Sequence, residues 1–278
     1  MTRPRTDDAA AIAQVLSDSP ALVLTGAGMS TGSGIPDYRG PDGARRVTPM
    51  HLSEFVASSA ARRRYWARSF VGWRRFSAAR PNAAHHFVTD LQRIGAVGPV
   101  ITQNVDMLHQ AAGTEGVIDL HGTLAEVVCL TCGARESRVD LDERMSSENP
   151  GFDVHSDEIR PDGDVHLEQM DVDAFRAPRC LRCGEDTLKP DVVFFGGAVA
   201  KPLVEHCFDL TDAAPSLLVL GSSLQVMSGL RFVRRAARRG IPVAIITRGP
   251  TRGDELATHR LDGELEPALR EVVDALRA

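Results

Sequence analysis

Short apolar runs recur along the chain, and segments with helical spacing of apolar residues separate most of them. The runs fall at residues 21–24, 100–102, 192–195, 217–220 and 243–246. Helical spacing is clearest at residues 9–16, 83–94, 203–213, 230–239 and 264–276. Because strands that alternate with helices build parallel sheets, the pattern predicts an α/β fold with helices on both faces of the sheet.

Two regions interrupt this alternation. Residues 41–80 hold a helical pattern rich in Arg and aromatic residues, and residues 129–186 hold four of the cysteines and a polar stretch rich in Asp and Glu. We interpret both regions as insertions that together build a second, smaller layer.

Composition and charge narrow the possible functions. The chain has 278 residues, 43% of them hydrophobic, and a net charge of −5, so we expect no broad binding to nucleic acid or to an anionic membrane. It contains no apolar run of about 18 residues, the length that a transmembrane helix needs. The N-terminal segment carries acidic residues and lacks a long apolar core, so we expect a polar tail that enters a helix rather than a secretory signal.

The first candidate site is the glycine-rich segment at residues 25–34, TGAGMSTGSG, which directly follows the first apolar run. A strand that ends in glycines lets the backbone come close to a pyrophosphate, and a helix that follows supplies N–H donors. The spacing is not a strict GxGxxG. A glycine-rich turn without a ligand is therefore an equally good interpretation of this segment alone.

Polar side chains follow the glycines and the later apolar runs. The sequence IPDYR occupies residues 35–39, TQNVD occupies residues 102–106, and His121 lies in a Leu-His-Gly triplet. Polar residues at the carboxyl end of a parallel strand lie where such sheets bind ligands. Asn and Asp also favour turns and helix caps, and a lone histidine more often has a structural role, so both interpretations stay open at this point.

Four of the five cysteines form two CxxC pairs, Cys129 with Cys132 and Cys180 with Cys183, whereas Cys207 stands alone. Four thiolates complete a tetrahedral site with no open position, which is typical of structural zinc. The gap of 47 residues between the pairs exceeds the usual spacing, but an insertion between knuckles need not move the ligands. A redox CxxC pair is the alternative. The odd cysteine count favours metal binding in a reducing compartment, and we expect a cytoplasmic protein.

The ordered set of motifs resembles the sirtuin family. It comprises GAGMSTGSGIPDYRG, TQNVD, LHG, the two CxxC pairs and GSSLQV at residues 221–226, and the likeness runs from about residue 22 to the C-terminal helix. Stretches such as RYWAR at 64–68, PDGDV at 161–165 and KPDVVFFG at 189–196 are similar to the class II branch. That branch includes the mitochondrial sirtuin with lipoamidase and ADP-ribosyltransferase activities.

The resemblance implies a Rossmann-like parallel-sheet domain with a smaller zinc-ribbon plus helical module. Residues 1–40, 81–128 and 187–278 would form the larger, NAD-binding domain, and residues 41–80 and 129–186 would form the smaller one. The ligands implied are NAD as co-substrate and one structural zinc ion on Cys129, Cys132, Cys180 and Cys183.

The family's roles map onto matching positions. The catalytic residues would be His121 as general base, with Asn104 and Asp106 holding the nicotinamide carboxamide and an ordered water. NAD would be bound by these two residues and by Gly26, Ala27, Gly28, Ser30, Asp37, Tyr38, Arg39, Gln103, Gly221, Ser222, Ser223 and Thr247. Phe195, Gly196 and Val226 would border the tunnel for the acyl-lysine. Gly197 stands where many members have an acidic residue, and Thr247 where many have Asn.

The implied reaction is NAD-dependent removal of acyl groups from lysines of proteins or peptides, with free lysine, nicotinamide and O-acyl-ADP-ribose as products. Two alternatives are kept. One is protein mono-ADP-ribosyltransfer from the same bound NAD, and the other is a non-catalytic module that only senses NAD. The sequence indicates neither the preferred acyl chain nor the oligomeric state.

Overall fold

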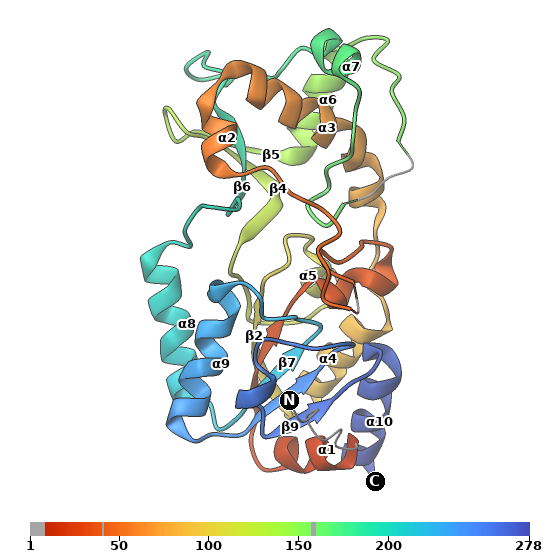
Figure 1. Cartoon of the computed structure of the whole chain (residues 1–278), viewed down its shortest axis with the longest axis vertical. Helices are drawn as coiled ribbons and strands as arrows, with labels where there is room; N and C mark the ends of the chain where they lie inside the picture. The colour runs from red at the N-terminus through yellow and green to blue at the C-terminus, as the bar shows by residue number, and fades with distance from the viewer. Residues whose placement is uncertain (1–8, 41, 157–159) are drawn as a thin grey trace.

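The computed structural model describes residues 9–40, 42–156 and 160–278. Two units lie one above the other along the longest axis of the molecule (Figure 1). The lower unit holds a six-stranded sheet, and the upper unit holds a three-stranded sheet with several helices. The expected polar tail at residues 1–8 falls outside the described residues.

The large sheet is parallel throughout, which confirms the predicted α/β fold. Its strand order is β3-β2-β1-β7-β8-β9. The three strands β1, β7 and β8 are buried at every position, so their sequences are continuous apolar runs rather than alternating ones. The bounds are β1 Ala21–Thr25, β2 Val97–Thr102, β3 Val117–Asp119, β7 Leu217–Leu220, β8 Val243–Ile246 and β9 His259–Leu261.

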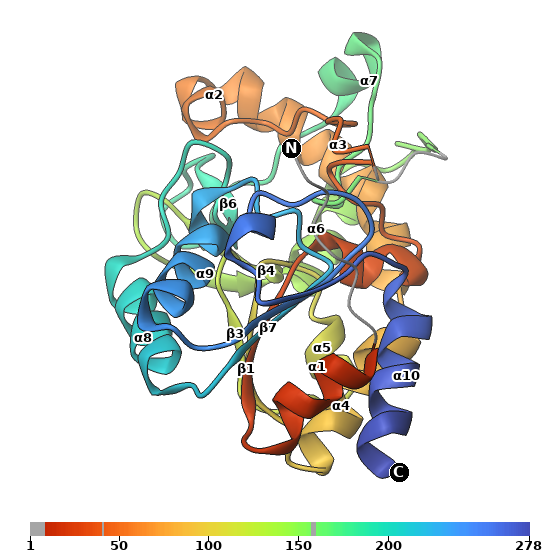
Figure 2. The same ribbon diagram turned by 60° about the horizontal axis from the view of Figure 1, so that its bottom comes forward.

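Helices cover both faces of this sheet (Figure 2). One face packs against α1 Ala9–Ser17, α4 Ala83–Arg93 and α10 Leu265–Arg277, and the other against α8 Lys201–Ala213 and α9 Met227–Arg239. Each of these helices buries one apolar stripe against the strands. The expected helical segments are therefore confirmed, with bounds shifted by a few residues at most.

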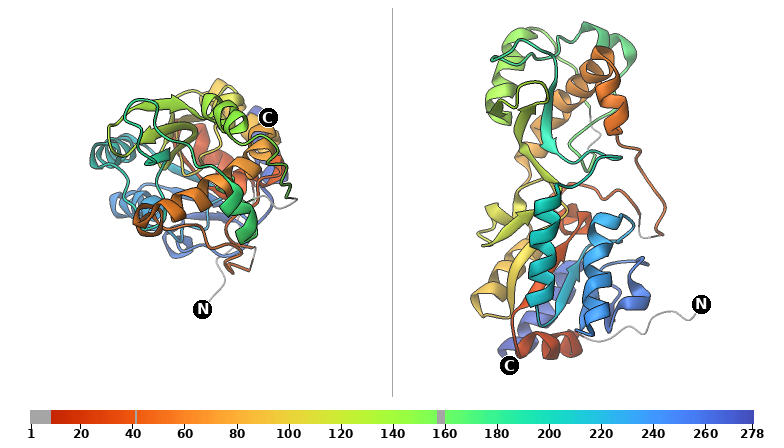
Figure 3. Two further views of the ribbon diagram at one scale, coloured as in Figure 1. Left: turned by 90° about the horizontal axis from the view of Figure 1, so that it is seen from above. Right: turned by 90° about the vertical axis from the view of Figure 1, so that its left-hand side faces the viewer.

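The upper unit is built on an antiparallel sheet with the order β5-β4-β6. Its strands are β4 Gly122–Cys129, β5 Arg135–Ser137 and β6 Leu188–Val192, and its helices are α2 Leu52–Ala57, α3 Ser59–Ala78, α6 Arg138–Glu148 and α7 Gln169–Ala174. Helix α3 buries Trp66, Tyr65 and Phe70 against this sheet and against α6 and α7. The side view in Figure 3 shows the chain passing between the two units several times.

Two details differ from the sequence-based expectations. The apolar run at residues 192–195 is not a strand of the parallel sheet, because β6 ends at Val192 and pairs with β4 in the small sheet. Strand β6, and β4 except for Cys129, lie within the residue ranges expected for the larger domain, yet both strands belong to the small sheet. The 3-10 helices are η1 Ala27–Ser33 and η2 Asp254–Leu256, and a short helix α5 spans Leu108–Ala111.

Among the described residues, no helix combines the length and the apolar character needed to cross a bilayer.

Candidate active site

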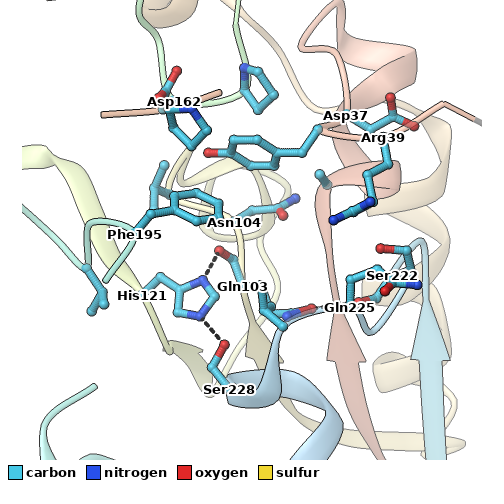
Figure 4. Close-up of a pocket in the computed structure, with 18 of the residues that line it drawn as sticks. Asp37, Arg39, Gln103, Asn104, His121, Asp162, Phe195, Ser222, Gln225 and Ser228 are labelled. Atoms are coloured by element: carbon cyan, nitrogen blue, oxygen red, sulfur yellow. Dashed lines mark hydrogen bonds between the residues drawn. The ribbon is translucent and has the colours of Figure 1, made fainter. Parts of the chain in front are cut away.

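A cavity of about 720 Å³ lies between the carboxyl ends of the parallel strands and the small unit. That volume falls within the range of about 300–1,000 Å³ that is usual for cofactor and substrate pockets. Every residue expected to bind NAD or to act in catalysis lines this cavity except Gly26. The two units contribute opposite walls, as the side chains drawn in Figure 4 show.

The glycine-rich turn joins β1 to the short helix η1. Gly26 is extended, and the helix expected after the turn is a 3-10 helix that spans residues 27–33. The Gly28 amide donates to the Gly221 carbonyl at 2.8 Å, and a Cβ on Gly28 would lie 2.8 Å from the Gly221 Cα. These glycines therefore also let the loops after β1 and β7 pack together at the cavity floor.

Ser30, Asn104 and Asp106 form one hydrogen-bonded cluster. The Asn104 amide donates to the Gly26 carbonyl at 3.1 Å and to Ser30 Oγ at 3.0 Å, and Ser30 Oγ donates to Asp106 Oδ2 at 2.5 Å. Asp106 Oδ1 accepts from the Leu108 amide at 2.9 Å. Burial raises the pKa of Asp106, whereas the bond from Ser30 opposes the shift. The cluster presents fixed amide and carboxylate groups to the cavity.

A buried polar chain supports Asn104 from below. Its backbone amide donates to Thr102 Oγ1 at 3.1 Å, and Thr25 Oγ1 donates to the same oxygen at 2.9 Å. His109 Nε2 lies 3.2 Å from Thr25 Oγ1, and the His109 ring meets the His85 ring edge-on at 5.0 Å. Burial lowers the pKa of His109 to about 4 and that of His85 to about 3, so both rings are neutral at physiological pH.

His121 is held by two hydrogen bonds (Figure 4). Its Nδ1 lies 2.9 Å from the Gln103 carbonyl, and its Nε2 lies 2.8 Å from Ser228 Oγ. Because a carbonyl can only accept, we assign the proton to Nδ1, which leaves the Nε2 lone pair free to accept. Burial lowers the pKa of His121, while the bond to Gln103 raises it. The ring is thus a neutral base with a fixed tautomer.

Gln103 and Ser222 join the two loops at the base of the cavity. Ser222 Oγ donates to Gln103 Oε1 at 2.7 Å. The Gln103 amide lies against Gly229 so closely that a Cβ there would be 2.5 Å from Nε2. Leu224, in the same loop as Ser222, has a φ of 54°, which is unusual for a branched residue. Such strain is common where a loop is fixed for ligand binding.

The segment after η1 covers the cavity from the side. Asp37 forms an ion pair with Arg46 at 3.1 Å, and the Arg39 guanidinium donates to the Gly43 carbonyl at 3.0 Å. Burial raises the pKa of Asp37 although Arg46 opposes the shift. The Tyr38 ring meets the Phe195 ring edge-on, with 5.6 Å between centroids. The segment 37–39 therefore touches the small unit through Tyr38.

Several cavity residues were not identified from the sequence. Ser228, Arg231, Tyr65 and Asp162 all line the cavity. Ser228 lies in the first turn of α9, which looks like an ordinary helix start, and Asp162 lies in the insertion between the CxxC pairs. Asp162 lies in the PDGDV stretch, which is similar to one branch of a family but does not indicate that this residue reaches the cavity.

The four paired cysteines meet at the end of the small sheet. All four Sγ atoms lie within 4.8 Å of one another, with 3.6 Å from Cys129 to Cys183 and from Cys132 to Cys180. Four thiolates at about 2.3 Å from a zinc ion would lie about 3.8 Å apart, so the sulfur positions fit tetrahedral zinc. Cys207 lies on α8, where it is buried in the core, and takes no part. Burial raises its thiol pKa to about 11.

Comparison with known proteins identifies the family. The model of the Sir2 family matches residues 26–228. The chain is 55% identical over 274 residues to NAD-dependent protein deacetylase 1 of Streptomyces coelicolor, covering 98% of this chain and 91% of that protein. It is 46% identical to the mitochondrial NAD-dependent protein lipoamidase sirtuin-4 of Bos taurus, covering 89% of this chain and 81% of that protein.

Solved structures agree with this result. A Sir2 enzyme matches with a TM-score of 0.79 and 29% identity over 98% of both chains. A Sir2 protein in complex with a p53 peptide and NAD+ matches with a TM-score of 0.76 and 29% identity, over 95% of this chain and 96% of that one. The family model matches most of the length of this chain, which also has the fold, the cavity and the cysteine cluster described above. The chain therefore belongs to the Sir2 family, the sirtuins.

Proposed function

We propose that this chain is an NAD-dependent protein-lysine deacylase, which gives free lysine, nicotinamide and O-acyl-ADP-ribose. The observation that carries the proposal is the position of His121. Its neutral ring can accept a hydrogen bond at Nε2, and it lines the same cavity as the Ser30–Asn104–Asp106 cluster. Named relatives at 46–55% identity are NAD-dependent deacetylases and a lipoamidase. Protein or peptide substrates are supported by the related Sir2 structure that holds a peptide.

The polar cluster would act at the nicotinamide end of the cavity. Bound NAD supplies an electrophilic ribose carbon when nicotinamide leaves. Both hydrogens of the Asn104 amide already donate to Gly26 and Ser30, so Asn104 offers its Oδ1 and Asp106 its carboxylate as acceptors for the N–H groups of a carboxamide. Gly26, Thr102 and Ser30 fix Asn104, whereas Ser30 and the Leu108 amide fix Asp106, so these groups need no rearrangement when the bond breaks. Gln103, Gly221, Ser222, Ser223 and Thr247 would position the ribose and adenosine.

His121 would act after nicotinamide has left. Its Nε2 is 2.8 Å from the Ser228 hydroxyl, which occupies the position where a ribose hydroxyl would donate its proton. The Gln103 carbonyl fixes the ring and stabilises the proton on Nδ1, as the orienting partner of a catalytic histidine does elsewhere. Substrate would then replace Ser228 as the donor.

The acyl-lysine would enter between the two units, beside Phe195, Gly196 and Val226, which line the cavity as expected. An extended substrate cannot pair with residues 227–230 as a strand, because these residues form the first turn of α9. The loop at residues 196–198 lies outside any helix or strand and is the better candidate to pair with the substrate backbone.

We propose a two-domain enzyme in which the boundary follows the sheets, so that β4 and β6 belong to the small domain.

Zinc would be held by the four cysteines and would supply folding energy rather than catalysis, because four thiolates leave no open coordination position. Thiolate ligands persist in reducing compartments, which supports the cytoplasm as the location we propose. Nothing observed adds weight to a nucleic-acid or membrane partner, and we propose none.

The decisive experiment for this function is nicotinamide release from NAD, measured with and without acylated peptides. A panel of lysine peptides that carry acetyl, butyryl, lipoyl and glutaryl groups also identifies the preferred chain. A deacylase releases nicotinamide in step with peptide deacylation. An ADP-ribosyltransferase releases it without acyl-peptide and labels a protein, and a sensing module releases none.

A further inference from the structure

Helix α9 carries a concentration of positive charge in a chain whose net charge is negative. Five arginines lie along its 13 residues, at positions 231, 234, 235, 238 and 239. Arg235 and Arg239 share one carboxylate, Asp212, which balances one of their two charges. In the described part of the chain, no carboxylate lies within 4.0 Å of Arg231 or Arg234. These two charges are therefore available to an external partner.

The guanidinium groups of Arg231 and Arg234 both lie beside one residue at the mouth of the cavity. Arg231 Nε donates to the Met227 carbonyl at 3.1 Å, and Arg234 Nη1 lies 3.9 Å from Met227 Sδ. Met227 lines the cavity and keeps 42% of its surface exposed, as Val226 keeps 39%. The neighbouring Ser228 points to His121 (Figure 4), which places this mouth next to the reacting end of the cavity.

The rest of the mouth does not cancel this charge. The cavity-lining acids are Asp37, Asp106 and Asp162, and the first two are held by Arg46 and by Ser30 respectively. Asp162 lies in the small unit, on the far side of the cavity from Ser228 of α9 (Figure 4). The opposite loop consists of Gly196, Gly197 and Ala198, which carry no charge. The α9 side of the mouth is thus locally positive.

We propose that Arg231 and Arg234 make this enzyme select acyl-lysine substrates that carry Asp or Glu close to the modified lysine. The proposal rests on the deacylase function and deepens it by specifying the substrate class. An acylated lysine is neutral, so a positive mouth does not repel it, whereas acidic neighbours are attracted. Arg234 does not line the cavity and is exposed, so it can reach the peptide beside the acyl-lysine but not an acyl group inside.

The test compares acetyl-lysine peptides that differ only in flanking residues, with Glu, Gln or Lys at positions one to three on either side. Exposed ion pairs contribute modestly, so we expect kcat/KM for the best Glu peptide to exceed that of its Gln counterpart by about three- to tenfold. The Lys peptide should be poorer than both. Raising the salt from about 50 mM to about 500 mM should remove most of the difference, because added ions screen exposed charges.

The double variant Arg231→Gln/Arg234→Gln should lose the Glu-over-Gln preference. The matched control is Arg238→Gln, which removes an equally exposed arginine from the last turn of the same helix and should keep it. Equal kcat/KM for Glu and Gln peptides in the wild type would overturn the proposal, as would an equal loss in the control.

A second arm identifies the source of the recognised carboxylate. Glutaryl-lysine with neutral flanks is compared with acetyl-lysine in the wild type and in the double variant. If the double variant loses only glutaryl turnover, the arginines recognise the acyl group and the proposal is wrong. Peptide affinity, measured by fluorescence anisotropy with NAD present, gives the Glu-to-Gln ratio independently of turnover. Absence of deacylation with an intact binding preference would therefore count against the proposed function and not against this inference.

Discussion

At the scale of single residues, the mechanism that we propose requires His121 to be neutral and correctly oriented. His121→Ala should lower deacylation by about 10²–10⁴-fold, the usual cost of losing a general base. NAD binding should change little, because a base that acts on an intermediate contributes little to cofactor affinity. Nicotinamide exchange should be damaged less than deacylation, since the base acts after nicotinamide leaves. Steady-state kinetics and exchange of labelled nicotinamide measure both, and near-normal deacylation would make His121 a structural residue.

The environment of His121 also predicts a pH profile. Burial lowers its pKa below the ordinary value of about 6.5. Because the base works only when deprotonated, activity should be retained as the pH falls through 6.5 and be lost only at a lower pH. The acid limb of kcat/KM against pH reports this value for the free enzyme. An acid limb at or above pH 7 would show that the ring is not held as the structure has it.

Thr102 tests whether the buried polar chain positions Asn104. Thr102→Val removes the oxygen that accepts from the Asn104 amide and from Thr25, without changing the side-chain shape. Nicotinamide exchange and deacylation should fall together by about two- to tenfold, as expected for loss of the hydrogen bond to Asn104, the one of the two that reaches the site directly. Thr102→Ser keeps the hydroxyl and should retain activity. Equal rates for the Val variant and the wild type would remove Thr102 from the account.

At the scale of elements, zinc should hold the small sheet together. Cys132→Ser should abolish stoichiometric zinc, lower the thermal midpoint and reduce activity indirectly, since structural zinc contributes folding energy. Cys207→Ser is the matched control and should keep the metal, because that thiol is buried in the other unit. Elemental analysis of purified protein measures the outcome. Active wild-type protein without zinc would contradict the assignment.

The start of β4 gives a second prediction at this scale. Gly122 follows His121, has a φ of 76°, and a Cβ there would lie 1.9 Å from the Asp191 carbonyl oxygen. Gly122→Ala should therefore destabilise the fold by more than about 2 kcal/mol, because it combines backbone strain with a steric clash. Gly95→Ala has a matching φ of 78° with open space around it, so it should cost only about 1–2 kcal/mol. Denaturant unfolding separates the two, and equal losses would refute the clash.

At the same scale, apolar runs predicted the buried strands well because central parallel strands face the core on both sides. The edge strands β3 and β9 have three residues each and gave no comparable signal. Residues 192–195 were assigned to the wrong sheet, since an apolar run indicates burial but not the partner strand. Only Phe194 of this segment is buried, and it packs against α2 and α3 of the small unit rather than against a parallel neighbour.

At the scale of the whole molecule, the site is assembled from both units, and this limited what the sequence could predict. Residues that follow predicted parallel strands, such as Gln103 and Ser222, could be expected at one edge of the sheet. Ser228 could not, because its contact with His121 depends on how α9 packs at a sequence separation of 107 residues. Asp162 and Tyr65 reach the cavity only through the docking of the small unit. Packing between units is not encoded by local periodicity.

The most direct test of the central claim is the fate of the acyl group. The wild-type enzyme is incubated with NAD and its best acyl-lysine peptide, and all products are quantified by mass spectrometry. We predict nicotinamide, deacylated peptide and O-acyl-ADP-ribose in equal amounts, because the acyl oxygen is joined to the ribose before water or base releases the lysine. Free carboxylic acid with NAD left intact would indicate simple hydrolysis and would contradict the account, as would ADP-ribose attached to protein with the acyl-lysine unchanged.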